Sequence, residues 1–203
     1  MRTLPLSSAP LVVNALLYPA RKITLYGRSA AALSIRYAAE AACQGHEVVY
    51  ICGDNLFDPY AIARIAGERS QSRDLALSRV YVARAFTGYQ FVELVKRLDP
   101  NESSRPVIIS GICSAFLDED IPNNDAARLY YRTLSRLAEL TDRGLAFLLA
   151  ETAEIAGTRR AYFLNDLFRA SNFILRLDGE STYTLEMRSY RPLLRFAPPA
   201  PLP

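Results

Sequence analysis

The chain has 203 residues and a formal net charge of +3; half of its residues are hydrophobic and 22% are charged. These values are ordinary for a soluble globular protein and predict one domain with a sizeable core. No apolar run approaches the ~20 residues that a transmembrane helix needs, and residues 1–19 lack a secretory pattern. We therefore expect a cytoplasmic protein that does not contact membranes.

Hydrophobic patterning predicts strands that alternate with helices along most of the chain. Residues 48–52 form an apolar run typical of a strand buried on both faces, and residues 126–140 have the spacing of an amphipathic helix. The predicted strands are 23–26, 48–52, 80–85, 107–112 and 146–150, and the predicted helices are 29–44, 59–67, 89–98 and 126–140. Two further strands, 173–177 and 183–188, follow as a hairpin that turns at Asp178-Gly179, and residues 1–20 are expected to be irregular or an edge strand.

This alternation predicts an α/β fold with a mostly parallel central sheet, helices on both faces and a C-terminal antiparallel hairpin. Residues 1–196 are expected to form a single domain, and residues 197–203 a proline-rich tail.

Cysteine and histidine usage argues against metal chemistry. Cys43, Cys52 and Cys113 are odd in number and lack the spacing of metal ligands, so we expect buried reduced thiols. His46 is the only histidine, which excludes a multi-histidine metal site. The sequence therefore predicts no metal centre.

One stretch has the layout of a nucleotide-binding loop. Strand 23–26 runs into Gly27 and then into an alanine-rich helix, where glycines, a lysine and a hydroxyl residue would cradle phosphates. Gly27 occupies the place of the first glycine and Ser34 that of the hydroxyl, but Ala32 and Leu33 occupy those of the second glycine and the lysine. The stretch has the length of a phosphate loop without its chemistry.

The order of motifs resembles the ATPase core of the RecA family over about residues 20–196. It is closest to RadA-type recombinases, their paralogues and KaiC-like proteins. The most specific piece is Val80-Tyr81-Val82-Ala83-Arg84-Ala85-Phe86, which is very similar to a RadA-type stretch. Tyr50-Ile51 with Phe57 and Pro59, and residues 183–194, resemble further parts of that core. The resemblance implies a RecA-like P-loop fold.

Catalytic positions of that family are altered here. Leu33 cannot neutralise phosphate charge as the P-loop lysine does, and Ala32 crowds the approach of phosphates. Gly111 stands where the resemblance implies an acidic residue of the Walker B motif, and Glu151 with Thr152 stands where it implies an Asn-Gln sensor. A carboxylate there would repel a γ-phosphate.

Three residues could keep a role that the resemblance implies for a nucleotide-binding site. Asp54 falls at the place of the water-activating glutamate, although a turn aspartate is an alternative interpretation. Ser34 could hold magnesium, and Arg28 could meet an anion at the helix N-terminus or be a solvated surface residue. The degenerate nucleotide-binding loop thus comprises Gly27, Arg28, Ser29, Ala32, Leu33 and Ser34. We expect no catalytic residue and no cofactor, with weak binding of ATP and magnesium left open.

The resemblance also implies DNA contacts in the loops after the fourth and fifth strands. Residues 117–125 are acidic, which argues against phosphate binding there. Residues 152–164 combine arginines with aromatic residues, a composition that suits single-stranded DNA and equally suits a loop whose aromatic side chains enter the core. The candidate contacts are Arg159, Arg160, Tyr162 and Phe163. A second group, Arg128, Arg132 and Arg136, is expected on a solvated helix face.

These features predict a catalytically inactive RecA-like accessory factor in DNA recombination or repair. It would bind single-stranded DNA, another RecA-family subunit, or a second copy of itself as a dimer. An alternative is a regulatory subunit that binds only protein, in the manner of an inactive KaiC-like paralogue. A third is an ATPase whose missing cation comes from elsewhere, such as a neighbouring subunit.

Overall fold

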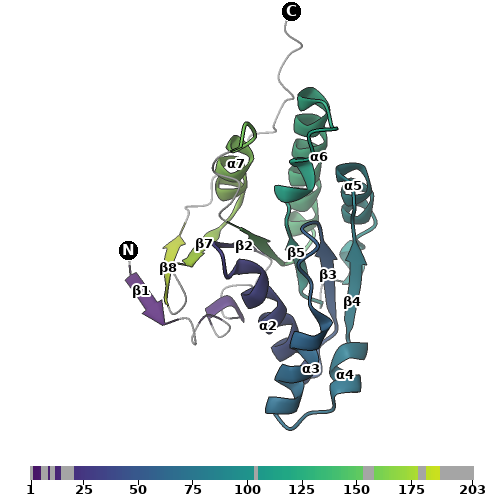
Figure 1. Ribbon diagram of the computed structural model, residues 1–203, viewed down its shortest axis with the longest axis vertical. Helices are drawn as coiled ribbons and strands as arrows, with labels where there is room; N and C mark the ends of the chain where they lie inside the picture. Colours follow the sequence, from purple (N-terminus) through teal and green to yellow (C-terminus); the bar gives the residue numbers. More distant parts are fainter. Residues whose placement is uncertain are drawn as a thin grey trace, which may run out of the picture.

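A single mixed sheet organises the chain. The computed structural model describes residues 2–5, 9, 12–14, 21–102, 105–152, 158–177 and 182–187. Eight strands follow the order β1-β8-β7-β2-β6-β5-β3-β4 (Figure 1). Strands β2 to β7 are parallel, β8 is antiparallel to β7, and β1 is antiparallel to β8. The strands are β1 (Arg2–Pro5), β2 (Lys22–Tyr26), β3 (Val48–Cys52), β4 (Val80–Arg84), β5 (Val107–Ser110), β6 (Phe147–Glu151), β7 (Phe173–Leu177) and β8 (Thr182–Met187).

Helices cover both faces of this sheet. The helices α2, α3 and α4 enclose one hydrophobic core, and α5, α6 and α7 enclose a second core on the opposite face (Figure 1). Every residue of β5 and β6 is buried, as expected for parallel strands between two helical layers. The helices are α2 (Ala30–Cys43), α3 (Pro59–Glu68), α4 (Arg73–Ser78), α5 (Gly88–Lys96), α6 (Asn123–Asp142) and α7 (Tyr162–Ala170), with short 3₁₀ turns η2 (Pro100–Glu102) and η3 (Ser114–Phe116).

Short polar residues start several of these helices at the predicted places. The Asp58 carboxylate accepts a hydrogen bond from the Tyr60 amide at 2.9 Å, with Pro59 as the first helical residue of α3. Such caps satisfy amides that have no partner within the helix. Thr87 caps α5 in the same way. These local signals explain why α3 begins at its predicted residue and α5 within one residue of the predicted start.

The α/β class, the mostly parallel sheet and the antiparallel hairpin are confirmed. Residues 2–5 form an edge strand, one of the two alternatives for that region. Helices α4 and α7 were not predicted, and the largest boundary errors are at α6, which runs from Asn123 to Asp142, at the end of α5, Lys96, and at the end of β5, Ser110. Most other predicted boundaries differ by one residue, as at Glu151, which belongs to β6. The predicted tail 197–203 and the turn at residues 178 and 179 lie outside the described residues.

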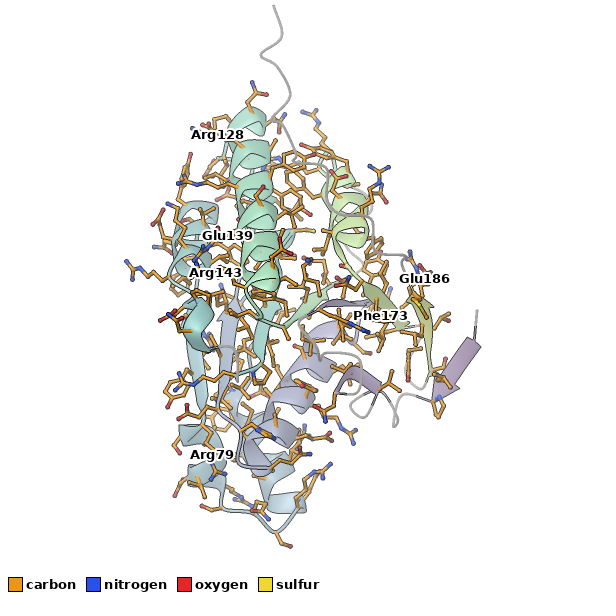
Figure 2. All side chains as sticks on the ribbon, turned by 180° about the vertical axis from the view of Figure 1, so that it is seen from behind. Arg79, Arg128, Glu139, Arg143, Phe173 and Glu186 are labelled. Carbon is orange, nitrogen blue, oxygen red and sulfur yellow. The ribbon has the colours of Figure 1, made fainter. Side chains whose placement is uncertain are left out.

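Two of the three α6 arginines, Arg128 and Arg132, are exposed as expected, whereas Arg136 is partly buried. Arg128 is exposed and pairs with Asp125 at 2.9 Å, and Figure 2 shows it with Glu139 and Arg143 spread along the helix. Arg136 instead donates to the Leu98 carbonyl at 3.1 Å, just beyond the end of α5. It therefore ties α6 to α5 rather than facing solvent.

The topology creates three places where neighbouring strands send the chain to opposite faces. The chain passes from β2 to α2 on one face and from β6 to α7 on the other, and β2 and β6 are adjacent. The strand β3, which leads to α3, forms such a pair with each of its neighbours, β5 and β4. In open α/β sheets, ligands bind outside the carboxyl ends of strands at these switch points. Gly27, Asp54, Gly111 and Glu151 all lie at this carboxyl edge.

Candidate functional site

The turn between β2 and α2 is too short to be a phosphate loop. Gly27 has φ of +133°, and a Cβ there would come within 2.8 Å of the Leu177 carbonyl oxygen. The Ala30 amide donates to the Gly27 carbonyl at 2.9 Å, which closes the turn at once. Since α2 begins at Ala30, only Arg28 and Ser29 separate Gly27 from the helix. The motif positions keep the spacing of a phosphate loop along the chain, but α2 begins before Ala32, the place of the second glycine.

The remaining residues of that motif are divided between the surface and the core. Arg28 and Ala32 are exposed, whereas Leu33 and Ser34 are buried. The Ser34 hydroxyl donates to the Ala31 carbonyl at 2.8 Å and shares a hydrogen bond of 2.8 Å with the Tyr50 hydroxyl. Burial raises the pKa of Tyr50 to about 12, so this phenol remains protonated. The Ser34 hydroxyl is thus engaged in the core, away from the turn.

Asp54 links the ends of β3 and β5. Its Oδ1 accepts hydrogen bonds from the Ser110 hydroxyl at 3.0 Å and from the Leu56 amide at 3.1 Å. The next residue, Asn55, has a φ of +59°, a conformation that asparagine tolerates in turns. This geometry is that of the turn aspartate. Its Oδ2 is buried and has no hydrogen-bond partner among the described residues.

The missing acid at position 111 has a steric explanation. Gly111 has a φ of +68°, and a Cβ there would lie 2.5 Å from the Asp54 Cβ and 2.6 Å from its amide nitrogen. No side chain fits in that space without moving the turn after β3. The glycine is therefore required by the close approach of two strand ends, and an aspartate could not simply replace it.

Glu151 faces into the protein. It is 1% exposed, and its carboxylate accepts from the Cys113 amide at 2.6 Å and from the Ser114 hydroxyl at 2.7 Å. Desolvation raises the pKa of Glu151 to about 7, although hydrogen bonds from Ser114, Cys113 and Thr152 lower it and the charge of Asp54 raises it. The residue thus anchors η3 against β6.

The four candidate DNA contacts are divided between surface and core. Arg159 and Tyr162 are exposed, the latter by 41%, whereas Arg160 is 7% and Phe163 0% exposed. Phe163 stacks on Tyr130 with ring centroids 4.1 Å apart. The sequence left open whether these aromatic side chains enter the core, and Phe163 does.

Arg160 holds together the two loops that the resemblance had assigned to DNA. Its guanidinium donates to the carbonyl oxygens of Phe116, Asp118 and Ile121 at 2.5 to 2.9 Å and to Asn123 Oδ1 at 2.9 and 3.1 Å. All five guanidinium N–H groups are therefore used within the protein. The acidic residues 118–120 are fixed beside this arginine.

A different edge of the sheet exposes apolar side chains. Nine large hydrophobic side chains are exposed among the described residues, and four of them lie on β4, the last strand of the sheet, or in the segment that directly follows it. Phe86 is 69% and Tyr81 48% exposed. We call this group the β4-edge patch; it comprises Tyr81, Val82, Phe86 and Tyr89.

The backbone of β4 is also available along this edge. The Arg79 carbonyl and the Ala85 amide both bond to β3. Because a parallel strand directs alternate residues to opposite neighbours, Tyr81 and Ala83 also face β3. The amide and carbonyl groups of Val80, Val82 and Arg84 point the other way, where no strand pairs with β4 in the described part of the chain.

The sequence predicted the strand at residues 80–85 but not its position at the edge of the sheet. Its side chains, Val-Tyr-Val-Ala, are as apolar as those of a central strand, and only the strand order places it at an edge. An edge strand with one solvated face would show polar and apolar residues in alternation. Residues 80–83 do not, and Val82, an apolar residue, is 40% exposed.

Comparison with models of known protein families finds no match to this chain, and neither does comparison with curated protein sequences. The RecA-like resemblance therefore stays a prediction. Among the described residues, no group of three or more His, Cys, Asp or Glu side chains is arranged to hold a metal ion. Within the same residues, no helix has the length and apolar character needed to cross a bilayer.

Proposed function

We propose that this chain is a catalytically inactive, RecA-like accessory factor in DNA recombination or repair that acts by binding a protein partner at the β4-edge patch. The partner is another RecA-family subunit. The observation that carries the proposal is the exposure of four hydrophobic side chains on β4, the strand at the open edge of the sheet, and in the segment that follows it. Patches of this kind mark protein–protein contacts on folded proteins.

The form of the contact follows from the backbone. An extended segment of the partner pairs with the outward amide and carbonyl groups of Val82, and its side chains lie against Tyr81 and Phe86. Strand addition of this kind uses main-chain hydrogen bonds for affinity and neighbouring apolar side chains for specificity.

The absence of ATPase chemistry supports an accessory role. Phosphoryl transfer needs charge placed around the phosphates, and the carboxyl edge instead holds Leu33 in the core, Gly111 against Asp54 and a buried Glu151. A nucleotide cofactor is accordingly not part of the proposal.

Val82→Pro is the most direct test. Proline removes an amide that points away from β3, so the sheet keeps its own hydrogen bonds while the added strand loses one. Binding to a purified RecA-family subunit from the same source, measured by calorimetry, is expected to weaken at least tenfold. Val82→Thr keeps the amide and serves as the matched control. Equal affinity of wild type and Val82→Pro would remove the β4 edge from the proposal.

A second candidate is binding of single-stranded DNA, favoured by the exposure of Arg159 and Tyr162, which are three residues apart at the start of α7. Fluorescence anisotropy of a labelled oligonucleotide tests it, with a slope of log affinity against log salt of about −0.7 per phosphate contact. Arg159→Ala should reduce that slope. A complex with protein but no DNA binding at low salt would favour the regulatory-subunit alternative.

A further inference from the structure

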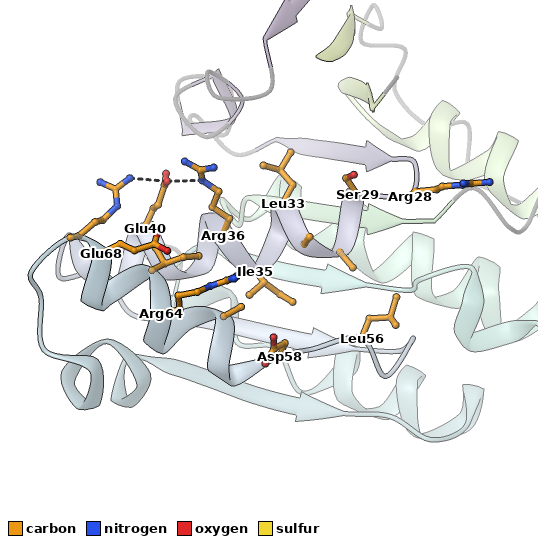
Figure 3. Close-up of a pocket in the computed structure, with 15 residues that line it drawn as sticks. Arg28, Ser29, Leu33, Ile35, Arg36, Glu40, Leu56, Asp58, Arg64 and Glu68 are labelled. Carbon is orange, nitrogen blue, oxygen red and sulfur yellow. Dashed lines mark hydrogen bonds and ion pairs between the residues drawn. The ribbon is translucent and has the colours of Figure 1, made fainter. Parts of the chain in front are cut away.

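A groove lies between α2 and α3 on the solvent side of the first helical layer. It has a volume of about 840 Å³, within the range of small-molecule sites. Its walls come from the exposed side of α2 and the facing side of α3 (Figure 3). The apolar part of its lining includes Ala32, Leu33, Ile35, Ala61 and Ile65.

Some of the charged side chains around the groove have partners within the protein and others do not. Arg36 and Arg69 both donate to the Glu40 carboxylate, at 3.1 and 2.8 Å, so these two cations share one anion (Figure 3). Asp58 is engaged as the cap of α3. Glu68 lies one turn beyond Arg64 on the same helix, and no ion pair joins the two.

Of the arginines that line the groove, Arg28 and Arg64 have no partner among the described residues, and Arg64 is the one that extends into it. It is exposed, and within the described part of the chain it has no hydrogen bond or ion pair. Figure 3 shows its guanidinium extending from α3 toward Ile35 of α2, whereas Arg28 at the end of the groove points away from it. A guanidinium without an ion pair thus lies beside an apolar surface.

We propose that the groove between α2 and α3 binds a small organic anion with an extended apolar body, such as a medium-chain carboxylate. The chain lies on Ala32, Leu33 and Ile65, and the carboxylate accepts hydrogen bonds from the Arg64 guanidinium, which suits carboxylates by its planar fork. A small molecule fits better than a partner helix, because a helix in a groove needs apolar anchors over several turns. This groove is separate from the proposed contact along β4, because none of its lining residues belongs to the β4-edge patch.

Decanoate, kept below its micelle concentration, is the probe, and isothermal titration calorimetry is the measurement. Decyltrimethylammonium has the same chain length with the opposite charge. We expect decanoate to bind and to raise the melting temperature, since it binds the folded state alone, and the cation to bind at least tenfold more weakly. Equal binding of both compounds would overturn the assignment of Arg64.

Variants locate the site. Ala32→Trp fills the groove from an exposed helical position and should weaken decanoate binding more than tenfold. Arg64→Ala should weaken it about threefold to fivefold, the size of a solvent-exposed ion pair, while Arg64→Lys keeps most of the affinity. Arg132→Ala removes an exposed arginine from α6, on the opposite face of the sheet, and should change nothing.

A replacement variant and a control complete the test of decanoate binding. If Ala32→Trp fails to fold, Arg64→Glu, a charge reversal at an exposed position, replaces it and should abolish binding. Decanoate affinity that persists in both Arg64→Ala and Arg64→Glu would refute the proposal, as would no heat of binding to the wild type. Val82→Pro separates the two proposals, because it should leave decanoate binding unchanged.

Discussion

The carboxyl edge of the central strands and the open edge at β4 use their side chains in opposite ways. At the carboxyl edge, polar groups are turned inward: Ser34 bonds to Tyr50, Asp54 to Ser110, and Glu151 to Cys113 and Ser114. At β4, apolar side chains such as Phe86 are exposed to solvent. The difference teaches that exposed groups able to meet a partner lie at β4, whereas the polar groups that sequence motifs single out at the carboxyl edge bond within the protein.

The carboxyl edge is closed by its own loops. Glu151 anchors η3, η3 and the following loop supply carbonyls to Arg160, and Arg160 fixes the turn before α7. A buried carbonyl or carboxylate without a partner costs free energy, so each of these contacts stabilises the next. Ligand binding at that edge would have to disrupt this chain of contacts.

The largest expected effect is that of restoring an acid at position 111. Gly111→Asp places a side chain at positive φ and in contact with the backbone of Asp54, so the free energy of unfolding should fall by about 4 kcal/mol. Urea denaturation measures it. Gly45→Asp is the matched control, because Gly45 has φ of +95° but a Cβ added there would meet no atom within 4 Å, and it should cost only about 1–2 kcal/mol. Equal losses in the two variants would show that the close approach to Asp54 is unimportant.

Arg160→Ala should follow in size. It leaves the buried carbonyl oxygens of Phe116 and Ile121 without their donor, and we expect a loss of about 3 kcal/mol in the free energy of unfolding. Arg159→Ala, one residue earlier and exposed, should stay within about 0.5 kcal/mol of wild type. A mild Arg160→Ala variant with reduced DNA affinity would instead return Arg160 to the candidate DNA contacts.

Glu151 should make stability depend on pH. Its pKa in the folded protein is about 7, above the ordinary glutamate value of 4.5, so the folded state binds its proton more tightly than the unfolded state does. Its contribution is full below about pH 4.5 and is lost as the pH rises through 7, by an amount on the order of 3 kcal/mol. Urea midpoints of wild type and Glu151→Gln between pH 4.5 and 8 measure it. Parallel curves for the two proteins would mean that Glu151 does not titrate in this range.

The smallest expected effect concerns nucleotide. Leu33→Lys restores the P-loop residue type, but position 33 lies inside α2 and is 5% exposed, so the lysine cannot reach a phosphate at the turn. Magnesium-ATP should shift the melting temperature of neither wild type nor variant. A ligand at 100 times its dissociation constant stabilises by about 2.7 kcal/mol, so a clear rise in melting temperature would revive the ATPase alternative.

Local sequence signals were enough to predict most of the elements. Apolar runs such as residues 48–52 predict buried strands because both faces of a parallel strand are covered. Asp58-Pro59 marks the start of α3 because the aspartate caps an amide of the first turn and the proline has the backbone angle of a first helical residue. The α/β class and the C-terminal hairpin follow from the order of these elements alone.

The tertiary structure decided everything that depends on distant neighbours. The absence of a side chain at position 111 is explained only by the turn at Asp54. The two residues are far apart in the chain but adjacent in space. The burial of Arg160 likewise depends on carbonyls from another loop, and the exposure of β4 depends on the strand order. Sequence patterns report the chemistry of a segment, but whether that chemistry is used inside the protein or offered to a partner depends on what the fold packs against it.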